Sequence, residues 1–161
     1  MSSLKAELKA KDIMTPEPVC VEPTTTVRQL ARVFEDNEIA GAPVVDQEGR
    51  VVAVVSQTDL IRQYIESGRG FPEADSLSQV GEQDTDDEIF TEPLLWVEDI
   101  MPSHPVTVTP QTPAHYVANL MVERRIHRIV VVDHDKFPVG IITSLDVLRV
   151  FSHPARSADS P

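Results

Sequence analysis

Two copies of one pattern, 87 residues apart, constrain this chain more than any other feature of its sequence. Each copy is an apolar run that ends in a hydroxyl residue, with an aspartate three residues later: residues 52–56 with Asp59, and residues 139–143 with Asp146. The same offset aligns most of the flanking sequence without a gap. Two long copies indicate a tandem duplication, because a solenoid needs at least about three units.

Each copy predicts a strand, a helix, two strands joined by a polar turn, and a second helix. In the first copy these are a strand at 19–21, a helix, a hairpin at 42–45 and 51–55, and a helix at 58–64. The second copy repeats the order with strands at 106–108, 129–132 and 139–142 and a closing helix that holds Val147, Leu148 and Phe151. Helical spacing places one buried face on each first helix: Val27, Leu30, Ala31 and Phe34, and then Ala114, Val117, Ala118 and Met121.

The duplication also predicts the domain organisation. We expect a first repeat at 11–66, an acidic connection at 67–96, a second repeat at 97–152 and a disordered tail at 153–161. A unit of about 50 residues is marginally stable alone, so the repeats should share one core about a pseudo-two-fold axis.

The charge distribution argues against nucleic acid as a partner. The net charge is −12, and residues 66–98 alone carry −9. Phosphate backbones are bound through Lys and Arg, which this chain has in the minority. The second repeat is close to neutral, so an anion site is more plausible there than in the connection.

Several other classes of protein find no support in the sequence. No run of about 18 apolar residues predicts a membrane span, and the polar start lacks the apolar core of a signal peptide, so we expect a cytoplasmic protein. The single cysteine, Cys20, is expected to be a small buried strand residue. The five histidines lack metal-ligand spacing. Arg124 and Arg125 are expected to form a solvated helix end.

The repeated hydroxyl and carboxylate have two possible roles. At a strand-to-helix junction both side chains project toward the first backbone N–H groups of the helix. A ribose suits this geometry, since its two hydroxyls can donate to one carboxylate and phosphate oxygens can accept from the N–H groups. Alternatively, Ser56 and Thr143 cap the following helices, with Asp59 and Asp146 completing capping boxes.

The whole pattern resembles a pair of CBS domains. The motifs that carry the resemblance are Asp-Ile-Met at 12–14 and 99–101, the segment 39–46, Val-Val-Asp at 131–133, and Gly-x-x-Thr-x-x-Asp at 140–146. The resemblance implies an α/β fold in which two β-α-β-β-α repeats pack about a pseudo-two-fold axis. It also implies two clefts that bind an adenosine compound such as AMP, ADP, ATP or S-adenosylmethionine.

Family roles can be carried onto this sequence position by position. In the first cleft Ser56 and Asp59 would hold ribose, and adenine would lie near Thr15, Pro16, Gly41, Ala42 and Pro43. In the second cleft Thr143 and Asp146 would hold ribose, adenine would lie near Pro102, Arg128 and Ile129, and His127 and Arg128 would neutralise phosphate.

The two copies differ in ways that predict a preference. The first has Ala53 where the second has Gly140, and Ala40 and Gly41 where the second has His127 and Arg128. A charge-assisted contact to phosphate is therefore expected in the second cleft. We expect a nucleotide to prefer the Thr143/Asp146 cleft, whereas Arg128 alone could also be a solvated charge at a strand edge.

The leading hypothesis is a non-enzymatic regulatory module that requires no cofactor and signals ligand binding by a conformational shift. It would form a homodimer through its helices and regulate an unidentified protein. The alternative is a ligand-free dimerisation scaffold. An enzyme that uses Asp59 and Asp146 as paired acids is disfavoured, because the duplication explains the pair and no nucleophile and base accompany it.

Overall fold

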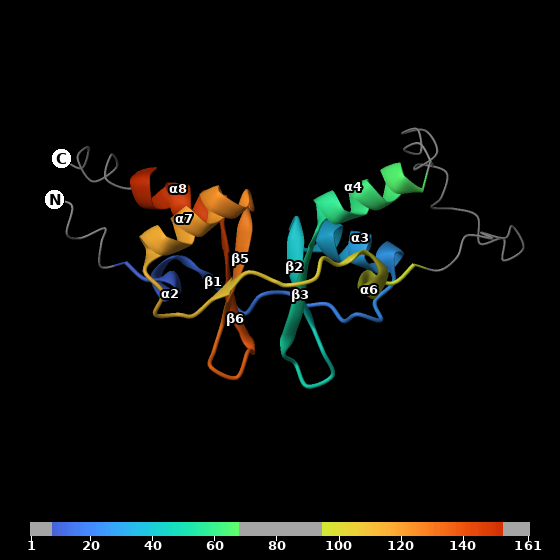
Figure 1. Ribbon diagram of the computed structural model, residues 1–161, viewed down its shortest axis with the longest axis horizontal. Coiled ribbons are helices and arrows are strands. Elements are labelled where there is room, and N and C mark those ends of the chain that lie inside the picture. The colour runs from blue at the N-terminus through green and yellow to red at the C-terminus, as the bar shows by residue number, and fades with distance from the viewer. Residues whose placement is uncertain (1–7, 68–94, 153–161) are drawn as a thin grey trace, which may run out of the picture.

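The computed structural model describes residues 8–67 and 95–152 and arranges them as two similar halves side by side (Figure 1). The predicted disordered tail and most of the predicted acidic connection lie outside these residues. The first half of the chain forms α2 (Ala10–Ile13), β1 (Thr15–Pro16), α3 (Val27–Asp36), β2 (Gly41–Val45), β3 (Val51–Ser56) and α4 (Gln57–Glu66). The second forms α6 (Val97–Ile100), β4 (Thr107–Val108), α7 (Ala114–Arg124), β5 (Arg128–Val132), β6 (Pro138–Thr143) and α8 (Ser144–Ser152).

The first long helix of each repeat lies on its own hairpin as expected. Helix α3 begins at a capping box in which Thr26 Oγ1 accepts from Gln29 N at 3.1 Å and Gln29 Oε1 accepts from Thr26 N at 3.0 Å. Leu30 and Phe34 are buried, but the expected burial of Ala31 is wrong. The inner face of α3 is rotated toward Val33, which packs against the core. On α7 the buried residues are Ala114, Val117 and Met121, while Ala118 is half-buried.

The strands form two sheets, each built on one predicted hairpin. Strands β2 and β3 pair antiparallel, and β5 and β6 do the same within a sheet of order β1-β6-β5-β4. The strand expected at 19–21 is reduced to a single parallel bridge between Val21 and Val44. Its equivalent, β4, is two residues long and runs parallel to β5.

The two leading segments are exchanged between the repeats, which the sequence did not predict. Strand β1 pairs with β6 of the second repeat, and α2 lies beside α7 and α8, whereas α6 lies beside the first repeat (Figure 1). The supporting backbone hydrogen bonds are equivalent in the two halves. Ala10 N donates to Thr112 O at 2.7 Å and Ala114 N to Leu8 O at 2.8 Å; Val97 N donates to Thr25 O at 2.7 Å and Val27 N to Leu95 O at 2.9 Å.

The exchange of α2 and α6 also determines which residues complete the apolar core of each repeat. The core of the first repeat includes Val97 from α6, and the core of the second includes Ala10 from α2. A third cluster, with Val51, Val130 and Val132 buried, joins the two sheets at the centre. The expected single core is therefore three apolar clusters, and neither outer cluster is complete without residues from the other repeat.

Within residues 8–67 and 95–152, no helix has the length and the apolar character needed to cross a membrane.

The exchange predicts that a substitution in α6 destabilises the opposite repeat. Val97 is fully buried in the first core. Val97→Ala should lower the free energy of unfolding by about 1–3 kcal/mol through lost apolar contact, and hydrogen exchange should accelerate more in β2 and β3 than in β5 and β6. The control Val122→Ala, at a side chain that is 78% exposed, should change stability by less than about 0.5 kcal/mol. Acceleration mainly in β5 and β6 would contradict the exchange.

Candidate functional site

Each repeated aspartate accepts two hydrogen bonds from its hydroxyl residue at the start of a helix. Ser56 N donates to Asp59 Oδ2 at 2.7 Å, and Ser56 Oγ donates to the same oxygen at 3.1 Å. In the second repeat, Thr143 N and Thr143 Oγ1 donate to Asp146 Oδ2 at 2.8 and 3.0 Å. The two carboxylates are buried, with 7% and 9% of Asp59 and Asp146 exposed. Both aspartates therefore cap the backbone N–H that precedes the helix, as expected. The hydroxyl accepts from the helix only in the second repeat, where Asp146 N donates to Thr143 Oγ1 at 3.3 Å, whereas the Ser56 side chain accepts no such hydrogen bond. Any ligand must use the acceptor capacity that remains on each carboxylate.

The second oxygen of each carboxylate faces an arginine one helical turn further on. Arg62 Nη1 lies 3.3 Å from Asp59 Oδ1, and Arg149 Nη1 lies 3.1 Å from Asp146 Oδ1. Both guanidinium groups are largely exposed. A carboxylate oxygen has two lone pairs, so each Oδ1 can accept a hydrogen bond from a ligand as well.

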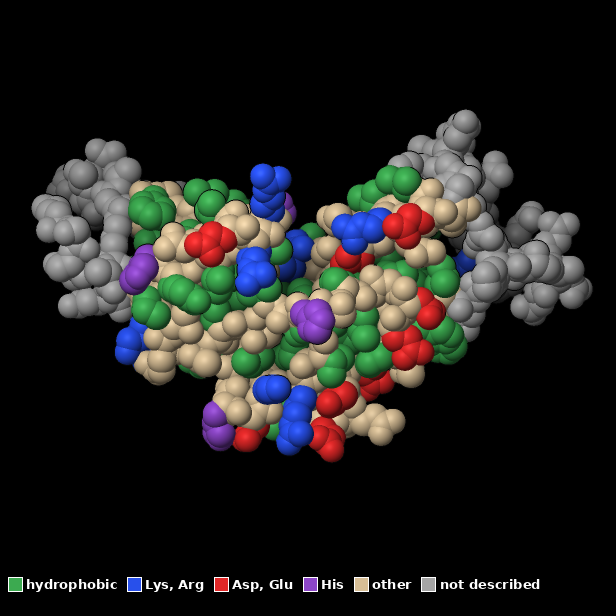
Figure 2. All heavy atoms as spheres, in the orientation of Figure 1, with side chains coloured by type: hydrophobic (Ala, Val, Ile, Leu, Met, Phe, Trp, Pro, Cys, Tyr) green, Lys and Arg blue, Asp and Glu red, His purple; other side chains and the backbone are tan. Residues whose placement is uncertain are grey.

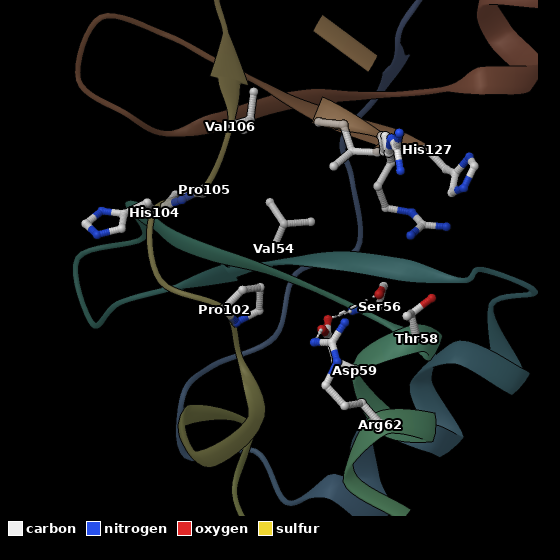
Figure 3. A pocket seen from close by; sticks show the side chains of 13 residues that line it. Val54, Ser56, Thr58, Asp59, Arg62, Pro102, His104, Pro105, Val106 and His127 are labelled. Atoms are coloured by element: carbon white, nitrogen blue, oxygen red, sulfur yellow. Dashed lines mark hydrogen bonds and ion pairs between the residues drawn. The ribbon is translucent and has the colours of Figure 1, made fainter. Parts of the chain in front are cut away.

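A cavity of about 310 Å³ lies between the repeats beside Ser56 and Asp59. Its volume is at the lower end of the range for small-molecule sites, which begins at roughly 300 Å³. Figure 3 shows Ser56, Thr58, Asp59 and Arg62 on one side and His127 and Val106 facing them across the cavity. The lining residues are Val54, Ser56, Thr58, Asp59, Arg62, Pro102, His104, Pro105, Val106, Arg125, Ile126, His127 and Arg128.

Arg128 crosses the boundary between the repeats. A Cβ atom at Gly41 would collide with the Cδ, Nε and Cζ atoms of Arg128, so the absence of a side chain at Gly41 allows the arginine to lie there. Burial lowers the pKa of Arg128, and the Asp59 carboxylate acts in the opposite direction. An arginine remains charged under such shifts, so Arg128 supplies positive charge beside Asp59.

The grouping of residues expected from the sequence is wrong. Pro102, His127 and Arg128 line the cavity beside Ser56 and Asp59, although the backbone of Arg128 also pairs with Thr143. Two structural facts account for this. The exchange of leading segments carries Pro102 to the first repeat, and the Arg128 side chain leans over Gly41 although its backbone pairs with Thr143 on the neighbouring strand. The expected preference for the Thr143/Asp146 cleft loses its basis, because the cations invoked for it line the other site.

The remaining predicted site residues lie elsewhere. Thr15 and Pro16 are exposed and pair with Ile141 and Gly140, on the strand that ends at Thr143. Ala42, Pro43 and Ile129 are buried in the strands. Their side chains do not line the cavity beside Ser56 and Asp59.

Sequence reasoning missed several residues of the cavity. Arg125, expected to be a solvated helix end, lines it, as do Arg62 and His104. The recurrence of an arginine three residues after each aspartate was the available signal for Arg62. Arg125 and His104 gave no such signal, because their positions follow from backbone turns at positive φ, 54° and 65°.

The Cys20 thiol and the possible metal-binding side chains were the other candidates for a functional site. Cys20 is half-buried, and its burial raises the pKa of the thiol. Among the residues that the structure places, no three His, Cys, Asp or Glu side chains form a group suited to a metal ion.

The chain belongs to the CBS domain family. The family model matches residues 10–66 and 97–153, which together contain both hydroxyl–aspartate motifs and the exchanged α2 and α6 segments. The fold and the two equivalent repeats agree with this membership.

Individual relatives are similar over most of the chain. CBS domain-containing protein CBSX1, chloroplastic, of Arabidopsis thaliana is 34% identical over 86% of this chain, which spans 61% of that protein. An uncharacterized protein of Methanocaldococcus jannaschii is 27% identical, with 86% and 88% of the two chains covered. The crystal structure of CBSX2 in complex with AMP matches with a TM-score of 0.69 and 26% identity, covering 91% of this chain and 98% of the other. Inosine-5′-monophosphate dehydrogenase of Halobacterium salinarum is 29% identical, but this chain spans only 23% of it.

The capping role of Asp59 predicts a stability effect that does not depend on any ligand. Asp59→Ala removes the acceptor of Ser56 N and should lower the free energy of unfolding by about 1–2 kcal/mol in urea titrations. Asp36→Ala, at an exposed position near the end of α3, should change it by less than about 0.5 kcal/mol. Equal effects of the two substitutions would contradict the capping geometry.

Proposed function

We propose that this protein is a non-enzymatic regulatory module that binds an adenine nucleotide in the cavity between Ser56, Asp59 and Arg128. The observation that carries the proposal is a buried carboxylate and three arginines on one cavity of suitable volume. The AMP complex of CBSX2, a protein of the same fold, supports adenosine compounds as the ligand class.

The ribose would bind at the carboxylate. Asp59 Oδ2 is occupied by Ser56 N and Ser56 Oγ, whereas Oδ1 has only the 3.3 Å contact with exposed Arg62. A ribose hydroxyl donating to Oδ1 makes a charge-assisted hydrogen bond. Apolar side chains of Val54, Pro102 and Ile126 line the same cavity and offer a surface for the adenine ring.

The phosphate would bind among the cations. Arg125, Arg128 and His127 line the cavity from the second repeat, whereas His104 lies on the opposite side of the cavity from His127 (Figure 3). Figure 2 shows Lys and Arg side chains on both sides of a hollow at the middle of the upper edge. Arginine suits phosphate because its planar group donates two parallel hydrogen bonds. These contacts favour AMP, ADP or ATP over S-adenosylmethionine in this cavity.

Regulation would follow from the position of the cavity. Its walls come from both repeats, so a ligand that bridges Asp59 and Arg128 stabilises one relative placement of the repeats. A ligand shifts a conformational equilibrium only by its difference in affinity for the two states. The regulated protein and the cytoplasmic location expected from the sequence stay predictions.

Calorimetry with the full chain tests the binding site. AMP and ATP should bind the wild type, and Asp59→Asn or Arg128→Met should weaken binding at least about tenfold, which is roughly 1.4 kcal/mol. Asp36→Asn serves as the matched control, because it removes an exposed carboxylate of similar chemistry outside the cavity. No stabilisation in thermal shift by AMP, ADP, ATP or S-adenosylmethionine would favour the ligand-free scaffold instead.

We also propose a homodimer formed through α4 and α8, which both lie along the upper edge in Figure 1. Each helix exposes large apolar side chains, among them Ile61 and Ile65 on α4 and Leu145 and Leu148 on α8. Ile61 and Leu148 are equivalent in the two repeats. The two helices lie on opposite sides of the molecule (Figure 1) and present two apolar surfaces related by the internal repeat, which can both face a second copy in an isologous dimer.

A charge introduced on the apolar surface of α4 or α8 should dissociate the dimer. Ile65 is 67% and Leu148 is 60% exposed, so Ile65→Glu and Leu148→Glu should leave folding intact and shift sedimentation from dimer to monomer, because a buried unpaired carboxylate is costly. Val122→Glu, on α7, should leave the dimer unchanged. A monomeric wild type would contradict the proposal.

A further inference from the structure

Gly41 and Arg128 occupy the same position in the two repeats, and they meet at the boundary between them. Gly41 begins β2 and pairs with Ser56, whereas Arg128, 87 residues later, begins β5 and pairs with Thr143. The Arg128 side chain lies against Gly41 of the other repeat. One of the two equivalent positions therefore supplies a long cationic side chain, and the other supplies the space that this side chain fills.

The backbone conformation at Gly41 does not itself require a glycine. Its φ is not positive, unlike that of Gly49 at 90°, so a residue with a side chain could adopt the same conformation. Glycine within a strand is unfavourable and often marks a place where another group approaches closely. Gly41 is buried, and the group that approaches it is the Arg128 side chain. The glycine is thus explained by this contact and not by the backbone.

A methyl group at residue 41 would occupy the place of the guanidinium group. Its carbon would lie 2.5 Å from Arg128 Nε and 2.9 Å from Arg128 Cζ, and Cδ would be in the way as well, whereas real Cβ contacts essentially never fall below 3.0 Å. These atoms belong to the movable end of a half-buried side chain, so the arginine can move while the strand stays in place. Gly41→Ala should therefore displace the guanidinium group without unfolding the protein.

The displaced group is the cation that lies beside the buried carboxylate of the cavity. Arg128 and Asp59 both line the cavity, and the charge of Asp59 acts on Arg128 across the boundary between the repeats. Gly41 does not line the cavity, so it offers a ligand no contact of its own. Any influence of Gly41 on a ligand passes through Arg128.

Resting on the nucleotide binding proposed above, we propose that Gly41 is a positioning residue for recognition of the phosphate. It leaves the space in which Arg128 is held beside the cavity, and it contacts no part of the ligand. The adenosine part of the ligand is bound by Asp59 and the apolar wall and does not depend on Gly41. Gly41 therefore determines how strongly the cavity prefers AMP to unphosphorylated adenosine.

Calorimetry with the full chain and two probes, AMP and adenosine, tests this role. Gly41→Ala should weaken AMP binding at least about tenfold through loss of a charge-assisted contact, and should change adenosine binding by less than about twofold. Gly140→Ala is the matched control, because it adds the same methyl group at another buried strand glycine, against Met14 and outside the cavity. The control should change the affinity for either probe by less than about twofold.

A double-mutant cycle separates positioning of the arginine from a general effect on the fold. In the Arg128→Ala background no guanidinium group remains to collide with residue 41. Adding Gly41→Ala to that background should therefore change the affinity for AMP by less than about twofold. A crystal structure of Gly41→Ala alone should show the Arg128 guanidinium displaced from β2.

Four results would overturn the inference: unchanged AMP binding in Gly41→Ala, equal loss of AMP and adenosine binding, the same loss of AMP binding with and without the arginine, or Arg128 in its original place in the variant structure. None of these removes AMP from the Asp59 cavity of the wild type. A wild type that binds no AMP would instead reject the proposed function and, with it, the inference. Thermal unfolding of each variant separates loss of binding from loss of folding.

Discussion

The hydrogen bonds between each leading segment and the opposite repeat are the constraint on which the rest of this structure depends. Ala10 N with Thr112 O, and Val97 N with Thr25 O, fix α2 and α6 on the turns that precede α7 and α3 of the opposite repeat. Backbone groups of this kind are costly to bury without a partner. The exchange therefore does more than join two units, because it places Ala10 and Val97 in the cores that they complete.

The same exchange builds the candidate site. Pro102 follows α6 to the first repeat and lines the cavity together with Ser56 and Asp59, while β5 contributes Arg128 from the other side. A cavity whose walls come from both repeats can respond to their relative position. A site built within one repeat would have no such sensitivity, which is why the geometry favours regulation over a purely structural role.

The duplication preserved local geometry and let charge diverge. Both aspartates keep their capping hydrogen bonds because each repeat needs a stable start to its last helix. At positions where folding requires only a turn at positive φ, the residues differ: Glu17 against His104, and Glu38 against Arg125.

Much of the fold was predictable from the sequence, and the composition of the site was only partly so. The hairpins and the long helices follow from local patterns of apolar, turn and capping residues and were found near their expected bounds. The strand expected at 19–21 was not, since only a single bridge at Val21 remains of it. The exchange depends on contacts between segments far apart in the chain, for which periodicity carries no information. Pro102, which the exchange carries to the cavity beside Asp59, was consequently assigned to the other cleft. Likewise, nothing in the sequence around Gly41 indicates that the Arg128 side chain lies over it.

A crystal structure of the protein grown with AMP tests the central claim most directly, since that claim is a spatial one. The account predicts the ribose hydroxyls at Asp59 Oδ1 and the phosphate beside Arg125 and Arg128, with contacts from both repeats. A nucleotide bound instead at Asp146 would contradict the account.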